Sequence, residues 1–560
     1  MNYILNNSLC NSCKDPRKLS PMTKVISRLW IILLLLPVLY LGFHIPFYSD
    51  EVTWKIMMAR LWRDLGMSIT TGPQCGKSFS VSIPLLFLPF RAFDSWLYED
   101  LTNLIKLRIL GGINFIFWIG ATWLLCKKLF KANSIVSNLS FLGVIFVCCL
   151  GILPFGMLMN RPEQPLLISL TLLLLLPFLQ DKTTKQRGLL IFSYLFLSLF
   201  FLSQHPKSLI FLPVLLIILK NLSASKKAKI ASLLPVLFAA GTTYHFSMQK
   251  LSCPLSFRYQ QTNASMGLSP SNFLKDPLWW NLKQIVKNMI GGWHYFGNIL
   301  FSKSYMSNWL PPNNHMEYGS HIINCFIVLI LSCLSLGSIV FCIQVISQRK
   351  KHYLESIPFQ IGCNLIISMV FITIVQTTKH QYESHLMIPL LTLGTLLLFA
   401  SFLETSGKII KSLNCGIIIL GIISFLSVIN LIHEFYPFKD KEWTRVGSLE
   451  GMNLSVSAFN FKEVENRVMA LKTKCNLGAP EKLKHLVIDD KTYPFFWKSN
   501  EPFHALYVMR LIGWGVDEDT SIFLSKHQSA GIICQCRALD ANLLAVAHRE
   551  GDLCCLPAFK

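Results

Sequence analysis

Small groups of ionisable and polar side chains stand at the ends of several long apolar runs in this chain. Because ionisable side chains are costly in lipid, their placement indicates where a membrane protein performs polar chemistry. The apolar runs themselves contain almost no Asp, Glu, Lys or Arg. The groups are Asp50 and Glu51; Lys77; Asn160, Arg161 and Glu163; His205 and Lys207; and His380, Tyr382, Glu383 and His385.

These residue types suit the transfer of a sugar from a lipid-linked phosphate donor to a hydroxyl group. A carboxylate can deprotonate or orient the acceptor hydroxyl, and cationic groups can bind the phosphate that leaves. The acidic pair Asp50 and Glu51 is then the candidate catalytic base. The candidate phosphate ligands are Lys77, Arg161, His205 and Lys207.

Each group also has a structural explanation, and the sequence leaves it open. Acids in the first turn of a helix are favourable whatever the function, and Ser49 is a suitable N-cap before the acidic pair. Arg161 and Glu163 could form a salt bridge that fixes a helix end. The later His–Lys pair could lie in the membrane interface. For His380, Tyr382 and His385 we expect a headgroup or packing role, since no acid stands at metal-ligand spacing beside them.

The composition identifies the class of protein. Of 560 residues, 52% are hydrophobic and only 15% are charged, which is typical of a polytopic membrane protein. The net charge of +22 does not indicate a nucleic-acid partner, because the basic residues fall on alternate loops between apolar runs. The charge is therefore explained by membrane topology.

The apolar runs predict about eleven transmembrane helices, each of roughly 20 residues. The basic segment 1–28 precedes the first run, so the N-terminus is expected in the cytoplasm. Basic clusters at 127–131, 182–187, 220–229 and 349–351 then fall on the same side. The predicted spans begin at about Leu29, Ile105, Ser134, Pro165, Gly188, Ser208, Ile230, Ile322, Pro358, Leu386 and Leu413.

Three segments are predicted to lie on the outer side. Two are large loops, 48–104 and 249–321, within the membrane domain 29–432, and the third is a C-terminal domain at 433–560. The C-terminal segment alternates strand-like and helix-like patterns, so we predict a small α/β domain there. Its cysteines predict disulfides if that side is oxidising, and a zinc site with His527 or His548 is the alternative. Those cysteines are Cys475, Cys534, Cys536, Cys554 and Cys555.

One motif points to a different activity and can be set aside. The stretch TGPQCGKS, Thr71 to Ser78, is similar to a phosphate-binding P-loop. Thr71 stands where the pattern needs glycine, no strand precedes the motif, and the loop is predicted to face away from cytoplasmic ATP. Nucleotide hydrolysis is therefore excluded.

The order of motifs in the N-terminal half resembles the GT-C glycosyltransferases, above all the lipid A aminoarabinose transferases and protein O-mannosyltransferases. The resemblance is carried by SDEVTW after the first span, then CGKSFSVSIPLLFLPFRAF, then LRILGGINFIFWIGATWLLCKKLF. In that family an acidic pair opens the first outer loop, a lysine lies further along it, and an arginine begins the next span. The residues at those positions here are Asp50, Glu51, Lys77 and Arg108.

Later elements extend the resemblance to roughly Tyr40–Phe402. They are MLMNRPEQPLLISLTLLLLLP, LSQHPKSLIFLPVLL and HQYESHLMIPLLTLG. Two positions depart from the family pattern: Lys77 is followed by Ser78 rather than proline, and Lys207 comes after Pro206 rather than before it. The resemblance implies an active site on the outer face and inversion at the anomeric carbon.

The sequence therefore predicts an α-helical GT-C-like membrane glycosyltransferase with an outer C-terminal α/β domain. We expect a polyprenyl-phosphate-linked sugar as donor, a lipid, glycan or protein as acceptor, and a bacterial inner-membrane location. No metal ligand is assigned, although a divalent ion held partly by Asp50 or Glu51 is an open alternative. A flippase for a lipid-linked glycan is the competing function. It is disfavoured because the chain shows no internal repeat and its polar residues collect at one face.

Overall fold

The computed structural model of the chain describes most of the membrane domain and part of the C-terminal segment. The predicted loop 48–104 is described only at 87–99, and the predicted loop 249–321 only at 249–251, 279 and 318–321. The described residues are 21–44, 87–99, 105–131, 134–151, 153–161, 163–179, 183–251, 279, 318–375, 384–402, 409–436, 444–445, 453–454, 461–477, 485–488, 492, 495, 503–505, 530–536, 539 and 541–557.

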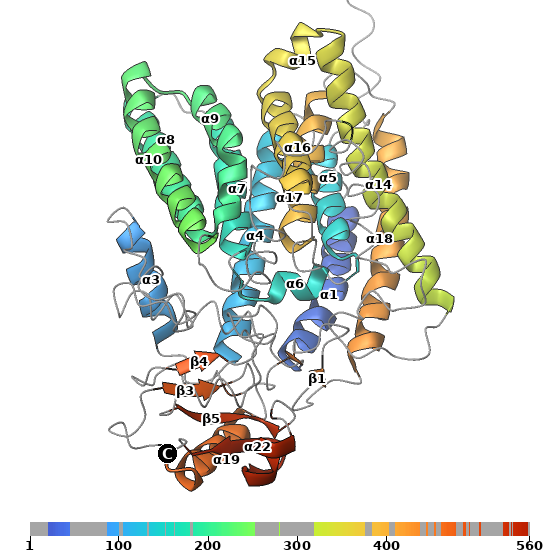
Figure 1. Ribbon diagram of the computed structural model, residues 1–560. Helices are drawn as coiled ribbons and strands as arrows, with labels where there is room; N and C mark the ends of the chain where they lie inside the picture. The colour runs from blue at the N-terminus through green and yellow to red at the C-terminus, as the bar shows by residue number, and fades with distance from the viewer. Residues whose placement is uncertain are drawn as a thin grey trace, which may run out of the picture.

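The membrane domain is a bundle of long apolar helices, and each predicted span begins within a helix (Figure 1). Four helices are long and apolar enough to cross a membrane, and five described helices are apolar but shorter. The principal bundle helices are α1 (Pro21–His44), α4 (Ile105–Leu129), α5 (Ser134–Cys148), α7 (Glu163–Leu175), α8 (Thr184–Gln204), α9 (Leu212–Asn221), α10 (Lys226–Leu251), α14 (Tyr318–Ser347), α16 (Ile357–Val375), α17 (Ser384–Phe402) and α18 (Ile409–Phe435). The predicted fold class is confirmed, and the number of membrane spans stays a prediction.

Short elements connect or border these helices. They are α3 (Leu88–Glu99), α6 (Leu153–Leu158), η3 (Leu176–Phe178), η4 (Pro206–Phe211) and α15 (Lys351–Glu355). Pro206 suits the first position of η4, where a missing N–H costs nothing. The two short turns η3 and η4 lengthen the apolar segments that contain α7 and α9.

Glycines allow close packing where helices approach one another. A Cβ on Gly111 of α4 would overlap the carbonyl oxygen of Leu158, which ends α6. A Cβ on Gly362 of α16 would lie 3.0 Å from the carbonyl oxygen of Gly394 on α17. The backbone of α4 therefore lies against the loop that leads into α7, and this contact positions the start of α7.

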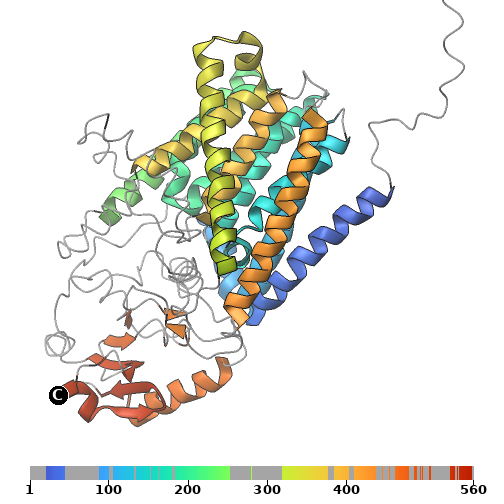
Figure 2. The same ribbon diagram turned by 90° about the vertical axis from the view of Figure 1, so that its right-hand side faces the viewer.

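The two ends of the bundle differ in charge. α4 ends, α8 and α10 begin, and α14 ends at the upper end in Figure 1, so the described basic clusters lie there. α7 begins and α8 ends at the opposite end, beside which the C-terminal sheet lies in both views (Figures 1 and 2). The charge pattern predicts that successive loops lie at opposite ends of the bundle, and the directions of these helices agree with that prediction.

The C-terminal segment contains a five-stranded sheet in the order β4-β3-β5-β7-β6. A sheet together with helices agrees with the small α/β domain predicted for this segment. β3 pairs in parallel with β4 and β5, whereas β7 pairs antiparallel with β5 and β6. A separate two-stranded pair, β1 (Thr444–Arg445) and β2 (Asn453–Leu454), precedes it. The elements of the domain are α19 (Phe461–Lys474), β3 (His485–Ile488), β4 (Phe503–Ala505), β5 (Ala530–Gln535), α22 (Ala541–Val546), β6 (His548–Glu550) and β7 (Leu553–Leu556).

Two disulfides join β7 to its neighbours. Cys475, just after α19, bonds to Cys555, and Cys536, just after β5, bonds to Cys554. Because adjacent residues of a strand point to opposite faces of the sheet, the two bonds tie β7 on both sides. Disulfides are therefore confirmed for four of the predicted cysteines, which removes them as zinc ligands, and Cys534 is buried on β5.

Candidate functional site

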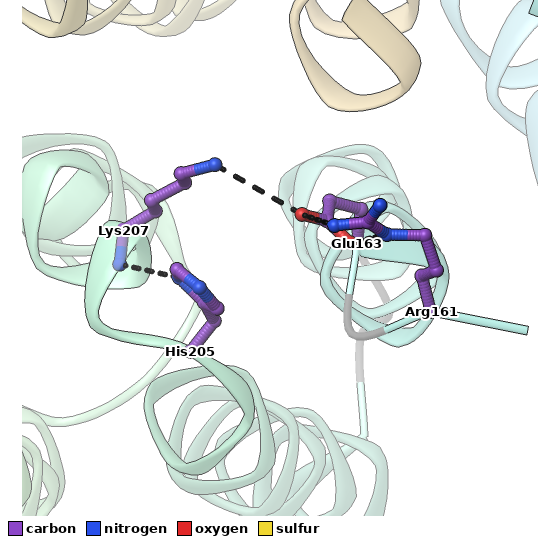
Figure 3. A network of polar contacts seen from close by, with 4 residues as sticks. All are labelled: Arg161, Glu163, His205 and Lys207. Carbon is purple, nitrogen blue, oxygen red and sulfur yellow. Dashed lines mark hydrogen bonds and ion pairs between the residues drawn. The ribbon is translucent and has the colours of Figure 1, made fainter. Parts of the chain in front are cut away.

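The structure brings together four of the predicted site residues. Arg161 and Glu163 stand at the start of α7, and His205 and Lys207 stand at the junction of α8 and η4 (Figure 3). We refer to these four residues as the α7 ion cluster. The other predicted residues Asp50, Glu51, Lys77, His380 and Tyr382 lie outside the described residues, as does the side chain of His385 in the first turn of α17.

Glu163 is the centre of the α7 ion cluster. The Arg161 Nε donates to Glu163 Oε2 at 3.1 Å, and a second guanidinium nitrogen lies 3.5 Å from Oε1. The Lys207 Nζ lies 3.9 Å from the same Oε1. Figure 3 shows the two cationic groups pointing toward the carboxylate from opposite sides. The salt bridge proposed from sequence for Arg161 and Glu163 is confirmed, and a second cation joins it.

The turn between α8 and α9 orients the other half of the cluster. His205 has extended backbone angles and is the N-cap of η4, where its Nδ1 accepts a hydrogen bond from the Lys207 backbone N–H at 3.1 Å. This local bond fixes the direction in which the Lys207 side chain leaves the turn. The side chain therefore reaches inward to Glu163.

Three members of the α7 ion cluster are almost completely removed from solvent, and His205 is half-buried. The side chains of Arg161, Glu163 and Lys207 are 5%, 4% and 11% exposed. Burial of a charge is costly unless it is paired and hydrogen-bonded, so these three groups depend on one another. Two cations and one carboxylate in a site of low dielectric constant create a positive field, and such a field suits an anionic group such as a phosphate.

The carboxylate also suits its place on the helix. Glu163 is in the first turn of α7, where a negative charge is stabilised by the backbone N–H groups of the helix N-terminus. A tight turn precedes it, because the Arg161 N–H donates to the Met159 carbonyl at 2.8 Å. Helix and turn together hold the acid and the arginine on one side of the chain.

Gln164 fixes this region to the rest of the bundle, and sequence reasoning missed it. Its Nε2 donates to the Gly111 carbonyl at 3.2 Å and to the Met157 carbonyl, and its Oε1 accepts from Asn114 Nδ2 at 3.2 Å. The amide thus joins α4, α6 and α7 directly beside Glu163. The sequence does contain a signal for Gln164, an amide side chain in the first turn of an otherwise apolar helix. A buried amide needs hydrogen-bond partners, so such a residue indicates contacts to other helices.

Arg108, which the family resemblance implies as a substrate-binding residue, is buried against the end of α1. Its side chain is among the most buried in the protein, at 1% exposure, and its Nη1 donates to the Gly42 carbonyl near the end of α1 at 2.6 Å. Arg108 therefore holds the end of α1, immediately before the segment that contains Asp50 and Glu51. Its predicted contact with substrate stays a prediction.

Within the part of the chain that the structure describes, no group of three or more His, Cys, Asp or Glu side chains is placed to hold a metal ion. The acids considered for a divalent ion, Asp50 and Glu51, lie outside that part. No residue is therefore assigned to a metal.

No protein-family model and no curated protein matches the sequence. Among solved structures, the chain is similar to the oligosaccharyltransferase AglB of Archaeoglobus fulgidus in complex with an inhibitory peptide and a dolichol-phosphate, with 8% identity, 92% of this chain and 70% of that chain covered, and a TM-score of 0.47. The oligosaccharyltransferase of the same organism matches in complex with Zn and sulfate (8% identity, 92% and 68% covered, TM-score 0.47) and in its apo form (8% identity, 92% and 69% covered, TM-score 0.44).

The similarity to these structures assigns no donor, no acceptor and no residue role to this chain. The identity of 8% to each of these structures is too low to transfer any of them. The resemblance to the GT-C glycosyltransferases rests on the sequence motifs of this chain.

Proposed function

We propose that the protein is a membrane glycosyltransferase that moves a sugar from a polyprenyl-phosphate-linked donor to a hydroxyl of a lipid, glycan or protein. The observation that carries the proposal is the α7 ion cluster, in which Arg161 and Lys207 converge on Glu163 at one end of an apolar bundle. A lipid-linked phosphate is an anion presented at the membrane surface, and a buried pair of cations is suited to binding it.

In the proposed reaction the acceptor hydroxyl oxygen attacks the anomeric carbon of the donor sugar. The carboxylate of Asp50 or Glu51 takes the hydroxyl proton, and the bond between the anomeric carbon and the phosphate oxygen breaks. The electron pair of that bond stays on the phosphate, whose charge Arg161 and Lys207 stabilise. Attack opposite to the leaving phosphate inverts the configuration at the anomeric carbon. Glu163 holds the two cations in place before the donor binds.

The proposed active face is the end of the bundle that carries the C-terminal sheet. Two disulfides in that domain favour an oxidising compartment, and the basic loops gather at the opposite end, as expected for the cytoplasmic side. The proposal therefore keeps the N-terminus in the cytoplasm and the C-terminal domain in the periplasm of a cell with an inner membrane.

The test compares membrane glycolipids and surface glycans in a deletion strain that carries either the wild-type protein or the double variant Asp50→Asn, Glu51→Gln. Protein levels are matched, and formation of the two disulfides in each sample reports correct folding and export of the C-terminal domain. We expect loss of one sugar-bearing product together with accumulation of its polyprenyl-phosphate donor. An unchanged glycan profile would overturn the assignment of the acidic pair as catalytic.

The same experiment separates the transferase from a flippase. A transferase that has lost its base leaves the donor accessible at the outer face, because delivery of the donor is intact. A defective flippase retains the lipid-linked glycan at the cytoplasmic face. Digestion of the accumulated lipid in intact and in broken spheroplasts by an added glycosidase distinguishes the two outcomes.

A further inference from the structure

A cavity of about 280 Å³ lies between α14 and α17, away from the α7 ion cluster. Its walls on α14 include Gly337, Ser338 and Phe341, and its walls on α17 include Phe399 and Phe402. An apolar cavity of about 150 Å³ accommodates one benzene molecule. This cavity can therefore take a hydrocarbon segment about twice that size.

The polar groups in the cavity wall satisfy one another. The hydroxyl oxygens of Ser338 and Thr395 lie 2.9 Å apart, and the Thr395 hydroxyl donates to the Leu391 carbonyl at 2.9 Å. A buried water needs two to four polar partners, and these hydroxyls are already engaged with protein atoms. The cavity is consequently suited to an apolar occupant.

The cavity opens toward the outside of the bundle, where the membrane hydrocarbon lies. Phe402 in its wall is 39% exposed, and Val340, one helical position from the lining residue Phe341, is 61% exposed. A Cβ added to Gly337 would meet no atom within 4 Å, so the backbone of α14 is open to the surroundings at this point. This open side is the one from which a lipid chain would reach the cavity.

A basic turn stands directly beyond the cavity at the end of α14. The backbone reverses at Arg349, which has a φ of 46°, and the Lys350 N–H donates back to the Val345 carbonyl at 3.2 Å. Arg349, Lys350 and Lys351 are all exposed on this turn. Basic residues at the ends of membrane helices attract anionic lipid headgroups.

The end of the cavity nearest the basic turn, at Phe341, lies within one bilayer leaflet of that turn. Eight residues separate Phe341 from Arg349, which corresponds to about 12 Å of helix. One leaflet contributes roughly 15 Å of hydrocarbon, half of the total core. A lipid whose headgroup lies at the basic turn therefore extends an acyl chain to the depth of the cavity.

We propose that the groove between α14 and α17 binds an anionic diacyl phospholipid of the surrounding bilayer. One acyl chain fills the 280 Å³ cavity, and the headgroup phosphate lies at Arg349, Lys350 and Lys351. This site stands at the opposite end of the bundle from the α7 ion cluster, so it is independent of the proposed transfer reaction.

The experiment measures lipid binding to the purified full-length protein by native mass spectrometry. Delipidated protein is titrated with phosphatidylglycerol or with phosphatidylcholine of the same acyl chains. We expect one phosphatidylglycerol per wild-type chain, bound at least tenfold more tightly than phosphatidylcholine. Gly337→Leu, which fills the cavity, should weaken phosphatidylglycerol binding at least tenfold. Gly241→Leu on α10 is the matched control, because a Cβ there also meets no atom within 4 Å, and it should bind as the wild type does.

The paired variant Lys350→Gln, Lys351→Gln tests the headgroup contact separately from the cavity. We expect it to reduce the preference for phosphatidylglycerol to less than threefold. Gly337→Ala, a smaller change, should fall between the wild type and Gly337→Leu and gives a second reading if the larger variant unfolds. Equal phosphatidylglycerol binding by Gly337→Ala, Gly337→Leu and wild type would overturn the cavity assignment. Equal wild-type affinity for both lipids would overturn the headgroup assignment.

Discussion

Ion pairs in the C-terminal domain and in the membrane bundle have similar N–O distances but differ in their exposure to solvent. In the C-terminal domain, Lys474 and Glu550 approach to 2.6 Å with side chains 50% and 37% exposed. At the start of α7, Arg161 and Glu163 are 3.1 Å apart but only 5% and 4% exposed. Exposed pairs contribute about 0 to 1 kcal/mol because water screens them and already solvates each charge. A buried charge that loses its partner costs several times more.

The comparison shows where the protein depends on charge. The exposed pairs, including Lys462 with Glu465, can be lost with little effect on folding. The α7 ion cluster holds its cations in a setting where each depends on the same carboxylate. The two cations are therefore already oriented for an anionic ligand before it binds. The free energy spent on burying them thus favours binding of that ligand.

The largest effect is expected from Glu163→Gln. The substitution keeps the shape of the side chain but leaves the Arg161 and Lys207 charges buried beside a neutral amide, at a cost of about 3–5 kcal/mol in the free energy of unfolding. Thermal unfolding of the purified protein measures it. Glu465→Gln is the control in an exposed pair and should change stability by no more than about 0.5 kcal/mol. Equal effects of the two variants would contradict the comparison.

The next effect concerns the disulfides of the C-terminal domain. Cys475→Ser with Cys555→Ser opens a bond that spans 80 residues, and we expect a loss of about 2–5 kcal/mol in the stability of that domain. Cys536→Ser with Cys554→Ser opens a bond that spans 18 residues, and chain entropy makes its expected loss smaller by about 1 kcal/mol. Denaturant unfolding of the domain, followed by protease resistance, measures both. A larger loss in the second variant would show that packing rather than chain entropy decides the difference.

A smaller effect is expected from Gln164→Met, which removes three hydrogen bonds but keeps the length of the side chain. Buried carbonyls of Gly111 and Met157 then lose a donor, at a cost of about 1–3 kcal/mol. If Gln164 also positions the start of α7, the KM for the donor should rise while kcat changes less. Gln344→Met, at an exposed position of α14, is the control and should leave both stability and KM unchanged.

The smallest effect belongs to the pair of Glu550 with Lys474, and it disappears in acid. The hydrogen bond and charge of Lys474 lower the pKa of the Glu550 carboxyl below its ordinary value of 4.5. A pKa lowered by folding stabilises the domain above that ordinary value, and the stabilisation is lost as the pH falls through the lowered pKa. Lys474→Met should therefore lower stability slightly at pH 7, and its difference from the wild type should disappear as the pH falls below 4.5. A difference between variant and wild type that is as large in acid as at pH 7 would contradict it.

The helical architecture could be predicted because membrane spans have a local signature. A run of about 20 apolar residues indicates a helix without knowledge of its neighbours, and charge on the intervening loops gives the direction of the chain. The strand at His485–Ile488 and the helix at Phe461–Lys474 in the C-terminal segment were also predictable, because their residue patterns are local in the sequence.

The contacts within the site could be predicted only in part. Arg161 and Glu163 are two residues apart, so their pairing follows from the sequence, whereas Lys207 comes from a separate helix hairpin. Gln164 joins Gly111 and Asn114 across some 50 residues, and no local pattern encodes that distance. The bond of Arg108 to Gly42 could not be predicted, because the end of α1 is brought beside Arg108 only by packing.

The bond between Cys475 and Cys555 encloses β3, β4 and β5 within a closed ring of chain. A protease that cuts once anywhere inside this ring leaves the two fragments covalently joined. The nicked domain should therefore run as one band on a non-reducing gel and as two on a reducing gel. In a compartment with active proteases, a single cut would leave the domain attached to the membrane bundle rather than release it.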